Sequence, residues 1–420
     1  MTVAEARRNR RRVVITGWGA ITPVGLSAEE TWTAFLEGRS GVAKISSFDT
    51  TGLLTQIAGE VKGFDPAHYM PHKISRRMDA YAQYALAATV QAAEAAKLTI
   101  TPHLASRVGV LIGSGYGPVG TYYRNAELLR EKGPRGVSPF SAVTGAMDSA
   151  TGEVSMMFGA TGPSRAISTA CATGTDAIGE ATRWIQHGYA DIVLTGGADC
   201  CVTAVDIAGS INARALSRRN DEPEKASRPF DEDRDGFVMS AGAGALVLEE
   251  ATGASNRGAP ILAEVIGYAT TSDAFHWTSP HPEGLGARRA MLDALADAGI
   301  EPSDVDYINA HGTSTELNDA TEVRAIREVF GDHAAEIPVS STKSMTGHMI
   351  GAAGAVELIA AAYAIRTGLV PPTINCDRPL DAEMNFVAHR PQERDTRIAM
   401  SNSFGFGGHN AVLLIRRWEE

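Results

Sequence analysis

Three residues with reactive side chains stand in small, glycine-rich surroundings: Cys171, His311 and His348. Cys171 lies in the run 168–179, where small residues lead into a pattern typical of a helix. A thiol at a helix N-terminus meets the positive end of the helix dipole, so we expect a lowered pKa for Cys171 and a favoured thiolate. The small neighbours leave room for a bulky substrate. A buried cysteine on its own, however, is usually inert packing.

The two histidines favour a nucleophilic role for Cys171. His311 stands in Asn-Ala-His-Gly-Thr (309–313), and His348 ends Lys-Ser-Met-Thr-Gly-His (343–348). Imidazoles beside a thiolate can accept or donate protons during covalent catalysis. A cysteine protease needs one base and one orienting group, whereas both histidines here have small neighbours that suit an enclosed site. We therefore expect an enclosed catalytic site built around Cys171.

The composition indicates a globular protein with a sizeable core. The 420 residues are 44% hydrophobic and 21% charged, with a net charge of -11. This length predicts two domains or one large duplicated domain. The acidic charge argues against a nucleic-acid partner. No apolar run is long enough for a membrane span and no secretory signal is present, so we expect a cytoplasmic protein without a membrane partner. The basic N-terminal cluster is expected to be a solvated arm: Arg7, Arg8, Arg10, Arg11 and Arg12.

The four cysteines, at 171, 200, 201 and 376, form neither a disulfide framework nor a spaced metal motif. We therefore expect no metal in the catalytic site. Cys200 and Cys201 are adjacent and are interpreted as small core residues at the end of a strand.

Strand-like and helix-like runs alternate along the chain, which predicts an α/β fold. Continuous apolar strands are typical of a sheet covered on both faces. Helices are expected at 80–95 and at 351–366, and the second is apolar nearly all round and should be deeply buried. Strands are expected at 12–16, 108–112, 191–195, 244–249, 263–268, 305–309 and 411–415.

A weak internal correspondence suggests two related halves. The strand that ends in Gly-Ser-Gly (113–115) is similar to the strand that ends in His-Gly-Thr (311–313). A small-residue stretch near 251–260 marks the division. We expect an N-terminal half, 1–255, with the nucleophilic cysteine, and a C-terminal half, 256–420, with both histidines.

The motifs and their order resemble those of the β-ketoacyl-[acyl carrier protein] synthases, the condensing enzymes of the thiolase superfamily. The resemblance covers essentially the whole chain, through the segments 13–17, 227–231, 234–238, 309–315 and 402–410. It implies the thiolase fold, in which two pseudo-repeated halves form a five-layered αβαβα core. It also implies the reaction: an acyl chain on a cysteine condenses with malonyl-carrier protein, which loses carbon dioxide, and grows by two carbons.

The resemblance implies a role for each catalytic residue. Cys171 carries the acyl chain as a thioester, and its backbone N–H forms an oxyanion hole with that of Phe406. The Nε2 atoms of His311 and His348 donate to the enolate oxygen. Lys343 matches part of an ion-paired support near the histidines.

Further residues match substrate-binding positions of the family. Thr313 and Thr315 match residues that bind the phosphopantetheine arm, and Phe406 matches a gate to the acyl pocket, with Phe404 and Gly407 beside it. Glu357 matches the partner of Lys343; a simple buried partner and a ligand of a structural monovalent cation are both open interpretations. The substrates are bound to the phosphopantetheine of the carrier protein, so no other cofactor is expected.

The resemblance implies an acidic carrier protein as partner, which a basic patch would attract even on an acidic enzyme. The chain is expected to form a homodimer, or a heterodimer with a chain-length factor. The residues that match the docking patch are Lys73, Arg76, Arg77, Arg135 and Arg214.

Several positions depart from the pattern. Tyr116 stands where long-chain elongating enzymes carry Ile or Leu, so it should change the chain-length or polarity preference. Ser141 stands where a phenylalanine of the dimer partner often closes the pocket floor. His409 replaces a common Thr and is interpreted as structural. The segments 239–244 and 318–322 also differ, and the second is similar to type II polyketide ketosynthases.

The departures leave alternatives open. The first is a ketosynthase subunit of a type II polyketide or polyene synthase, paired with a chain-length factor. A degradative thiolase would need a second active-site cysteine near the C-terminus, and none follows Cys376. A partner that only sets chain length would not need the complete set Cys171, His311, His348 and Lys343.

Overall fold

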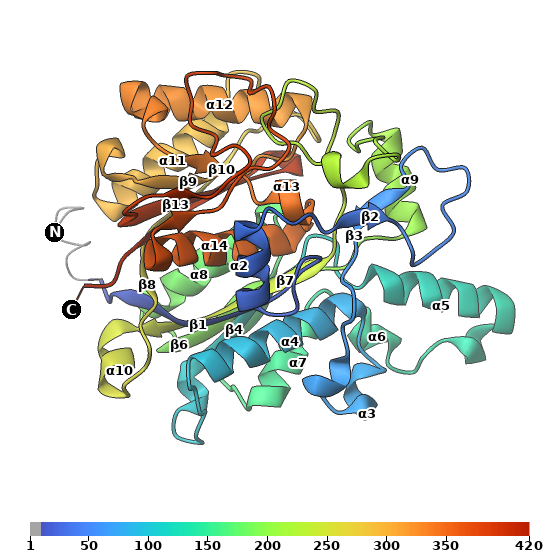
Figure 1. Cartoon of the computed structure of the whole chain (residues 1–420). Coiled ribbons are helices and arrows are strands. Elements are labelled where there is room, and N and C mark those ends of the chain that lie inside the picture. The colour runs from blue at the N-terminus through green and yellow to red at the C-terminus, as the bar shows by residue number, and fades with distance from the viewer. Residues whose placement is uncertain (1–9, 420) are drawn as a thin grey trace.

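Ten strands of the described residues form one mixed sheet whose two halves repeat the same strand order (Figure 1). The computed structural model describes residues 10–419. The order is β5-β4-β6-β7-β1 in the first half and β10-β9-β13-β14-β8 in the second. In each half the first three strands are parallel and the last two are joined antiparallel. The expected pseudo-repeat is therefore present in the topology.

The halves meet where β1 pairs with β8, at Val13–Val265, Val14–Glu264 and Ile15–Ala263. The first half contains β1 (Val13–Ile21), β4 (Val108–Gly113), β5 (Ser164–Ile167), β6 (Ile192–Asp199) and β7 (Gly242–Glu250). The second contains β8 (Ala263–Ser272), β9 (Tyr307–Asn309), β10 (Val339–Ser340), β13 (Ile398–Gly405) and β14 (His409–Arg416). Two small hairpin-like sheets pair β2 (Val42–Lys44) with β3 (Ile57–Gly59) and β11 (Leu369–Val370) with β12 (Gln392–Glu393).

Helices cover the sheet halves in alternating layers (Figure 1). The central pair, α8 (Thr173–Gln186) and α14 (Ala353–Thr367), lies between the two halves. The helices α4 (Ala80–Ala95) and α7 (Ser149–Phe158) cover the outer face of the first half. On the second half α11 (Leu285–Ala298) and α12 (Glu316–Phe330) do the same. Separate apolar clusters fill the spaces between these layers, and the expected five-layered αβαβα core is confirmed.

The central helix α14 is the most thoroughly buried of these helices. It is apolar on every side, and only its last turns reach solvent. The window Ile350–Thr367 has the length and composition of a membrane span, contrary to the expectation that no such run exists. However, 83% of that window is buried within the protein. It is therefore the core helix that the sequence predicted at 351–366, and its hydropathy reflects its neighbours in the central layer.

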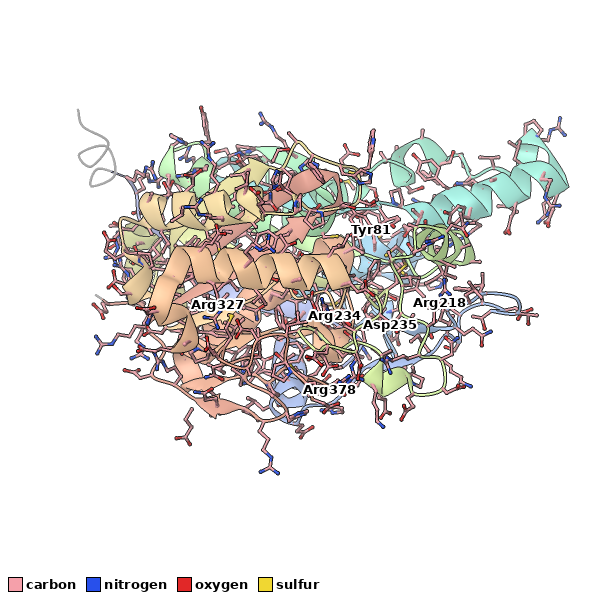
Figure 2. All side chains as sticks on the ribbon, turned by 90° about the horizontal axis from the view of Figure 1, so that it is seen from above. Tyr81, Arg218, Arg234, Asp235, Arg327 and Arg378 are labelled. Atoms are coloured by element: carbon pink, nitrogen blue, oxygen red, sulfur yellow. The ribbon has the colours of Figure 1, made fainter. Side chains whose placement is uncertain are left out.

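The remaining helices are α2 (Ala28–Leu36), α3 (His72–Ser75), α5 (Val119–Lys132), α6 (Ser141–Thr144), α9 (Ala204–Asn212), α10 (Ala251–Asn256) and α13 (Lys343–Thr346). Of these, α2 packs into the central apolar cluster, and all four residues of α13 are buried. Seen from above, α12 crosses the outer face near Arg327, and α5 projects well beyond the rest of the molecule (Figure 2).

The predicted strands and helices all occur, and α4 matches its predicted limits because Asp79 caps its N-terminus. In the large sheet the sequence missed β5, β10 and β13, which are short or carry polar residues. It also missed the short strands of the two small sheets.

The expectation that the basic N-terminal cluster is a solvated arm is wrong for three of its five arginines. Arg10, Arg11 and Arg12 form ion pairs with Asp297, Asp191 and Glu264, so they fasten the start of β1 to the sheet. Arg7 and Arg8 lie outside the described residues.

Candidate active site

Cys171 lies at the inner end of α8, in a single 3-10 turn formed by Ala170–Ala172. Its side chain is 7% exposed. Ala170 has φ 51°, a left-handed conformation that costs free energy for a residue with a Cβ and therefore needs support from its surroundings. Gly405 supplies one such contact, since a Cβ there would meet the backbone N of Cys171 at 3.0 Å. The nucleophile therefore sits on a sharp turn against the end of β13.

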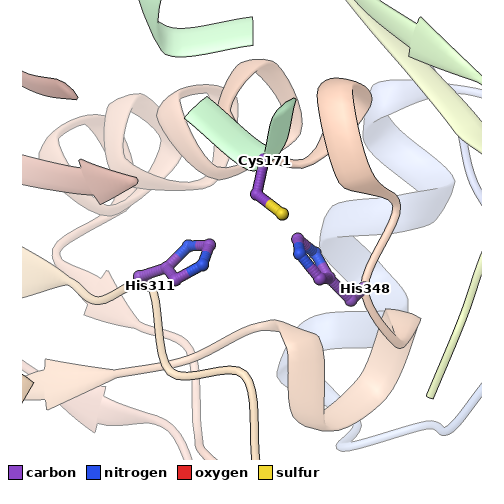
Figure 3. Close-up of side chains that lie close together, drawn as sticks. All are labelled: Cys171, His311 and His348. Carbon is purple, nitrogen blue, oxygen red and sulfur yellow. The ribbon is translucent and has the colours of Figure 1, made fainter. Parts of the chain in front are cut away.

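The structure brings Cys171, His311 and His348 together (Figure 3). The sulfur and one ring nitrogen of each histidine lie within 4.8 Å of one another. All three side chains are buried. The two rings are perpendicular, with their centroids 5.4 Å apart. Cys171, which lies 140 and 177 positions before the two histidines, thus forms one enclosed cluster with them, as the sequence predicted.

An aromatic ring packs against each of the two imidazoles. Phe237 meets His348 edge-on with centroids 5.4 Å apart, and Phe404 meets His311 at 5.9 Å. Both ring nitrogens of His348 are buried without a hydrogen-bond partner. An unsatisfied buried nitrogen costs free energy unless a ligand pairs with it. The ring of His348 is therefore available to a substrate.

Lys343 supports His311 from behind. Its buried ammonium donates to Nδ1 of His311 at 3.3 Å, to the His311 carbonyl at 2.7 Å, and to Glu357. These three acceptors use all three N–H groups of the lysine. Since Nδ1 accepts, the neutral ring of His311 carries its proton on Nε2, which makes Nε2 a donor. Glu357, which the resemblance matches to the partner of Lys343, accepts from its ammonium behind His311.

Burial keeps both histidines neutral at physiological pH. Burial is the larger cause that lowers the pKa of His311 and of His348 well below the usual value, and the charge of Lys343 adds to it. A neutral imidazole has one N–H donor and one acceptor nitrogen. Each ring can thus donate one hydrogen bond to a developing negative charge while the other nitrogen accepts.

The expected lowering of the Cys171 pKa is wrong. Burial raises the pKa of the Cys171 thiol to about 11, and this outweighs the N–H of Phe406 and the charge of Lys343, which lower it. The thiol lies at a helix N-terminus as predicted, but the sequence did not show how dry the surroundings are. The backbone N–H groups of Phe406 and Cys171 both act on the sulfur, which places two donors beside the nucleophile.

Two buried carboxylates on α12 hold the loop that carries His311. Glu322 accepts from the backbone N–H groups of His311 and Gly312, each at 2.8 Å. Asp319 accepts from those of Thr313 and Ser314. Burial raises the pKa of Glu322 to about 7. The segment 318–322, which differs from the usual family pattern, therefore retains the acidic residues that hold this loop. The hydroxyls of Thr313 and Thr315 are 2.9 Å apart, near the mouth of the pocket.

Asp199 holds the loop that carries Tyr116. The fully buried carboxylate accepts from the Ser114 hydroxyl and from the N–H groups of Gly115 and Tyr116. It also accepts from Gly351 at 2.7 Å, so it links the two halves beside Cys171. Neither residue of this link was singled out from the sequence, because the contact spans 152 positions. The Tyr116 side chain lies close enough to Cys171 for the two groups to interact electrostatically.

The aromatic residues of the gate occupy two different elements. Phe404 is half-buried in β13, so it does not belong to the loop in which the sequence placed it. Phe406 begins the next turn and is 42% exposed. Gly407 has φ 80°, a conformation that glycine adopts without strain, and this allows the chain to reverse beside Phe406.

The other positions that differ from the family pattern lie outside the cluster of Cys171, His311 and His348. Ser240 donates to the Thr346 carbonyl at 2.7 Å and so supports the segment before His348. His409 lies near Asp176, in the first turn of α8, which fits a structural role. Ser141 starts α6 and none of its contacts reach Cys171 within its own chain.

The five residues of the expected docking patch are exposed, and within residues 10–419 none forms an ion pair. Arg76 and Arg77 line a groove of about 270 Å³ together with Arg124 of α5. Arg77 stacks on Phe140, with 4.3 Å from its guanidinium carbon to the ring centroid. Sequence reasoning missed Arg124; its position on a strongly charged exposed helix was the available signal. The other three lie on separate elements: Lys73 on α3, Arg135 after α5 and Arg214 after α9.

Thiolate and imidazole groups also bind Zn²⁺. Here, however, the Lys343 ammonium lies 3.3 Å from Nδ1 of His311 and would repel a divalent cation. The donor set therefore suits a reaction that develops negative charge between the histidines better than it suits a metal.

The chain matches two family models over most of its length. Residues 10–254 match the beta-ketoacyl synthase N-terminal domain, and residues 262–377 match the C-terminal domain. It is 49% identical to the 3-oxoacyl-[acyl-carrier-protein] synthase 2 of Staphylococcus aureus (strain COL), covering 97% of this chain and 99% of that protein.

Two solved structures are also similar. The ishigamide ketosynthase/chain length factor has a TM-score of 0.91 at 37% identity, covering 98% of this chain and 100% of that chain. The ketosynthase complex of AntDE with the type II acyl-carrier protein AntF has a TM-score of 0.88 at 34% identity, covering 97% and 100%.

The raised pKa of Cys171 predicts slow alkylation that accelerates with pH. Because the thiolate is the reactive form, the rate with iodoacetamide should rise close to tenfold per unit between about pH 7 and pH 9, without levelling. Peptide mass spectrometry at Cys171 measures the rate, and Cys171→Ala gives the background from the other cysteines. A plateau below pH 8 would mean that the helix dipole outweighs burial.

Proposed function

The chain belongs to the beta-ketoacyl synthase family, and we propose from this premise that Cys171, His311 and His348 carry out its condensing reaction as a 3-oxoacyl-[acyl-carrier-protein] synthase. The observation that carries the assignment of roles is the enclosed cluster of one thiol and two neutral imidazoles within 4.8 Å. The enzyme moves an acyl chain from a carrier protein to Cys171 and then condenses it with malonyl-carrier protein.

In the first step the sulfur of Cys171 attacks the acyl thioester. The thiol must lose its proton as the carbon–sulfur bond forms, because burial favours the neutral thiol. An unpartnered ring nitrogen of His348 accepts this proton and returns it to the departing thiolate of the carrier. The backbone N–H groups of Cys171 and Phe406 stabilise the negative carbonyl oxygen.

In the second step malonyl-carrier protein loses carbon dioxide, and the electron pair of the broken bond forms an enolate. The enolate oxygen accepts hydrogen bonds from Nε2 of His311 and from the ring N–H of His348. The enolate carbon then attacks the acyl carbonyl, and the Cys171 thiolate leaves. Lys343 orients His311 through Nδ1 and keeps Nε2 as the donor. Thr313 and Thr315 bind the phosphopantetheine arm near the mouth of the pocket, and Phe404, Phe406 and Gly407 form its gate.

A structural monovalent cation fits beside the catalytic centre. Three buried oxygens lack hydrogen-bond partners: Oε2 of Glu357, Oδ1 of Asn309 and Oγ of Ser401. Asn309 and Ser401 are paired across neighbouring strands, and α14, which carries Glu357, packs on both strands. Oxygen donors of this kind are suited to hard cations. A cation there would compensate the unpaired carboxylate oxygen and stiffen the support of Lys343.

We also propose that the chain pairs with a second subunit through its exposed first half. The edge strand β5 has free hydrogen-bonding groups on one side, and an edge of this kind favours pairing with another chain. Met156 is 69% exposed and Met157 36% on the neighbouring α7. Two partners are open. In the fatty-acid pathway the partner is a second copy of this chain. The likeness to the ishigamide ketosynthase/chain length factor supports a non-identical partner. The mass of the purified chain in solution distinguishes the two. A cytoplasmic location is part of the same proposal.

Substitutions at the three catalytic residues should separate the two steps. Cys171→Ala should abolish condensation, whereas Cys171→Gln should leave malonyl-carrier decarboxylation detectable, because the amide resembles an acylated thiol. His311→Ala and His348→Ala should each lower decarboxylation about 100-fold, since each removes a donor to the enolate oxygen. Carbon dioxide release and product mass spectrometry measure these steps. Full condensation by Cys171→Ala, or unchanged decarboxylation in both histidine variants, would contradict the roles.

The exposed arginines should attract the acidic carrier protein. Charge reversal of Arg76, Arg77 and Arg214 together should lower kcat/KM with carrier-bound substrates about tenfold at low salt and weaken its salt dependence, because long-range attraction is lost. Small pantetheine thioesters should react at nearly the same rate as with the unaltered enzyme.

The matched control reverses three exposed arginines elsewhere, Arg289, Arg390 and Arg397, for the same change in net charge. Equal losses on carrier-bound and pantetheine substrates would show that the patch serves the fold and not docking.

A further inference from the structure

A polar cluster lies near Cys171. Tyr116 lies near both Cys171 and Asp206, and the side chain of Ser210 interacts with its hydroxyl. Tyr116 is 36% exposed, and the burial of the rest of its side chain is the largest cause of its raised pKa. Asp206 and Ser210 are one turn apart on α9, so they lie on the same face of that helix. We call Tyr116, Asp206 and Ser210 the α9 cluster.

The α9 cluster lies on a helix that packs next to Cys171. His311 and His348 adjoin the sulfur, and the N–H of Phe406 faces it. Cys171 also packs in an apolar group with Cys201, Ile207 and Ile350. Ile207 belongs to α9 and follows Asp206 directly. An acyl chain that leaves the sulfur along Ile207 therefore passes α9 and the neighbouring Tyr116.

Asp206 has acceptor capacity that the protein does not use. One carboxylate oxygen accepts from the Tyr123 hydroxyl at 3.2 Å, and the other accepts from the Thr203 hydroxyl at 2.6 Å. Two carboxylate oxygens together offer about four acceptor positions. Asp206 is half-buried, and this burial raises its pKa. A ligand with a hydroxyl group could pair with these free positions.

A saturated acyl chain would displace water from the cluster and give no hydrogen bond in return. Leaving a buried donor or acceptor unpaired costs more free energy than an ordinary hydrogen bond contributes. An acyl chain with a hydroxyl group, in contrast, can donate to Asp206 and accept from Tyr116 or Ser210. The polar groups thus disfavour the plain chain and favour the oxygenated one.

We propose that the α9 cluster selects acyl chains that carry a hydroxyl group over unsubstituted chains of the same length. The inference rests on the proposed condensing function, because it assumes that Cys171 carries the acyl chain. It assigns Asp206 and Ser210 as specificity-determining residues in addition to Tyr116.

Asp206 also supports the start of α9, which shapes the choice of variants. Its carboxylate accepts from the Thr203 hydroxyl at 2.6 Å and so orients the hydroxyl that caps the helix. Asp206→Asn would therefore disturb the helix as well as the cluster. Tyr116→Phe and Ser210→Ala each remove one hydroxyl and leave the cap intact. Tyr189→Phe removes a hydroxyl from a surface tyrosine that is 64% exposed and serves as the matched control.

The experiment measures the rate of Cys171 acylation from carrier-bound decanoyl and from a series of monohydroxydecanoyl isomers, by intact-protein mass spectrometry. In the wild type at least one isomer should react about three- to tenfold faster than decanoyl, as expected for one additional hydrogen bond. Tyr116→Phe and Ser210→Ala should reduce this ratio towards one, and Tyr189→Phe should leave it unchanged.

Two results would overturn the inference while the proposed function stands. The first is a wild type that accepts decanoyl as readily as every hydroxylated isomer and still condenses it with malonyl-carrier protein. The second is a preference for a hydroxylated isomer that both cluster variants retain in full. Absence of acylation and condensation with every chain would refute the condensing function itself, and the inference with it.

Discussion

The ammonium group of Lys343 is buried in the protein interior, and the catalytic pocket is organised around its charge. A charge in such a place is stable only if hydrogen-bond acceptors surround it closely. Glu357 and two atoms of His311 meet this requirement, so the lysine joins α13, α14 and the loop after β9. The same charge helps to keep both histidines neutral and lowers the pKa of Cys171 against the effect of burial. One interaction therefore fixes the geometry of the site and the protonation of its members.

Much of this arrangement was predictable because short sequence motifs indicate it. Cys171, His311 and His348 stand in motifs that belong together, and α4 has a complete capping signal and an alanine-rich core. The pKa of Cys171 was not predictable, since the helix N-terminus is visible in the sequence but the dryness of the pocket is not. Contacts between distant segments were not predictable either. Asp199 reaches Gly351 across the two halves, and Arg124 lines the basic groove only because α5 begins beside Arg76 and Arg77 in the fold.

The repeated strand order shows how one architecture supports two different contributions. A 3-10 turn precedes α8 at Ala170–Ala172 and α14 at Ile350–Ala352, and Ala170 and Ile350 share φ 51°. Gly351 is thus the counterpart of Cys171. A Cβ at Gly351 would meet Oδ2 of Asp199 at 2.6 Å, so this position has no space for a second nucleophile. The first half supplies the thiol, and the second supplies the histidines and the buried lysine.

The central apolar layer has a consequence for how the protein is made. Its largest cluster combines residues of both halves, for example Ile178 and Trp184 of α8 with Leu358 and Ile359 of α14. During synthesis on the ribosome, α8 emerges while the segment that covers it has not yet been translated. At typical elongation rates the 181 residues from the end of α8 to the end of α14 require about 10 to 35 s. Over this interval the nascent chain exposes an apolar helix, which makes it a substrate for chaperones and gives the cell a period in which the half-made enzyme can aggregate.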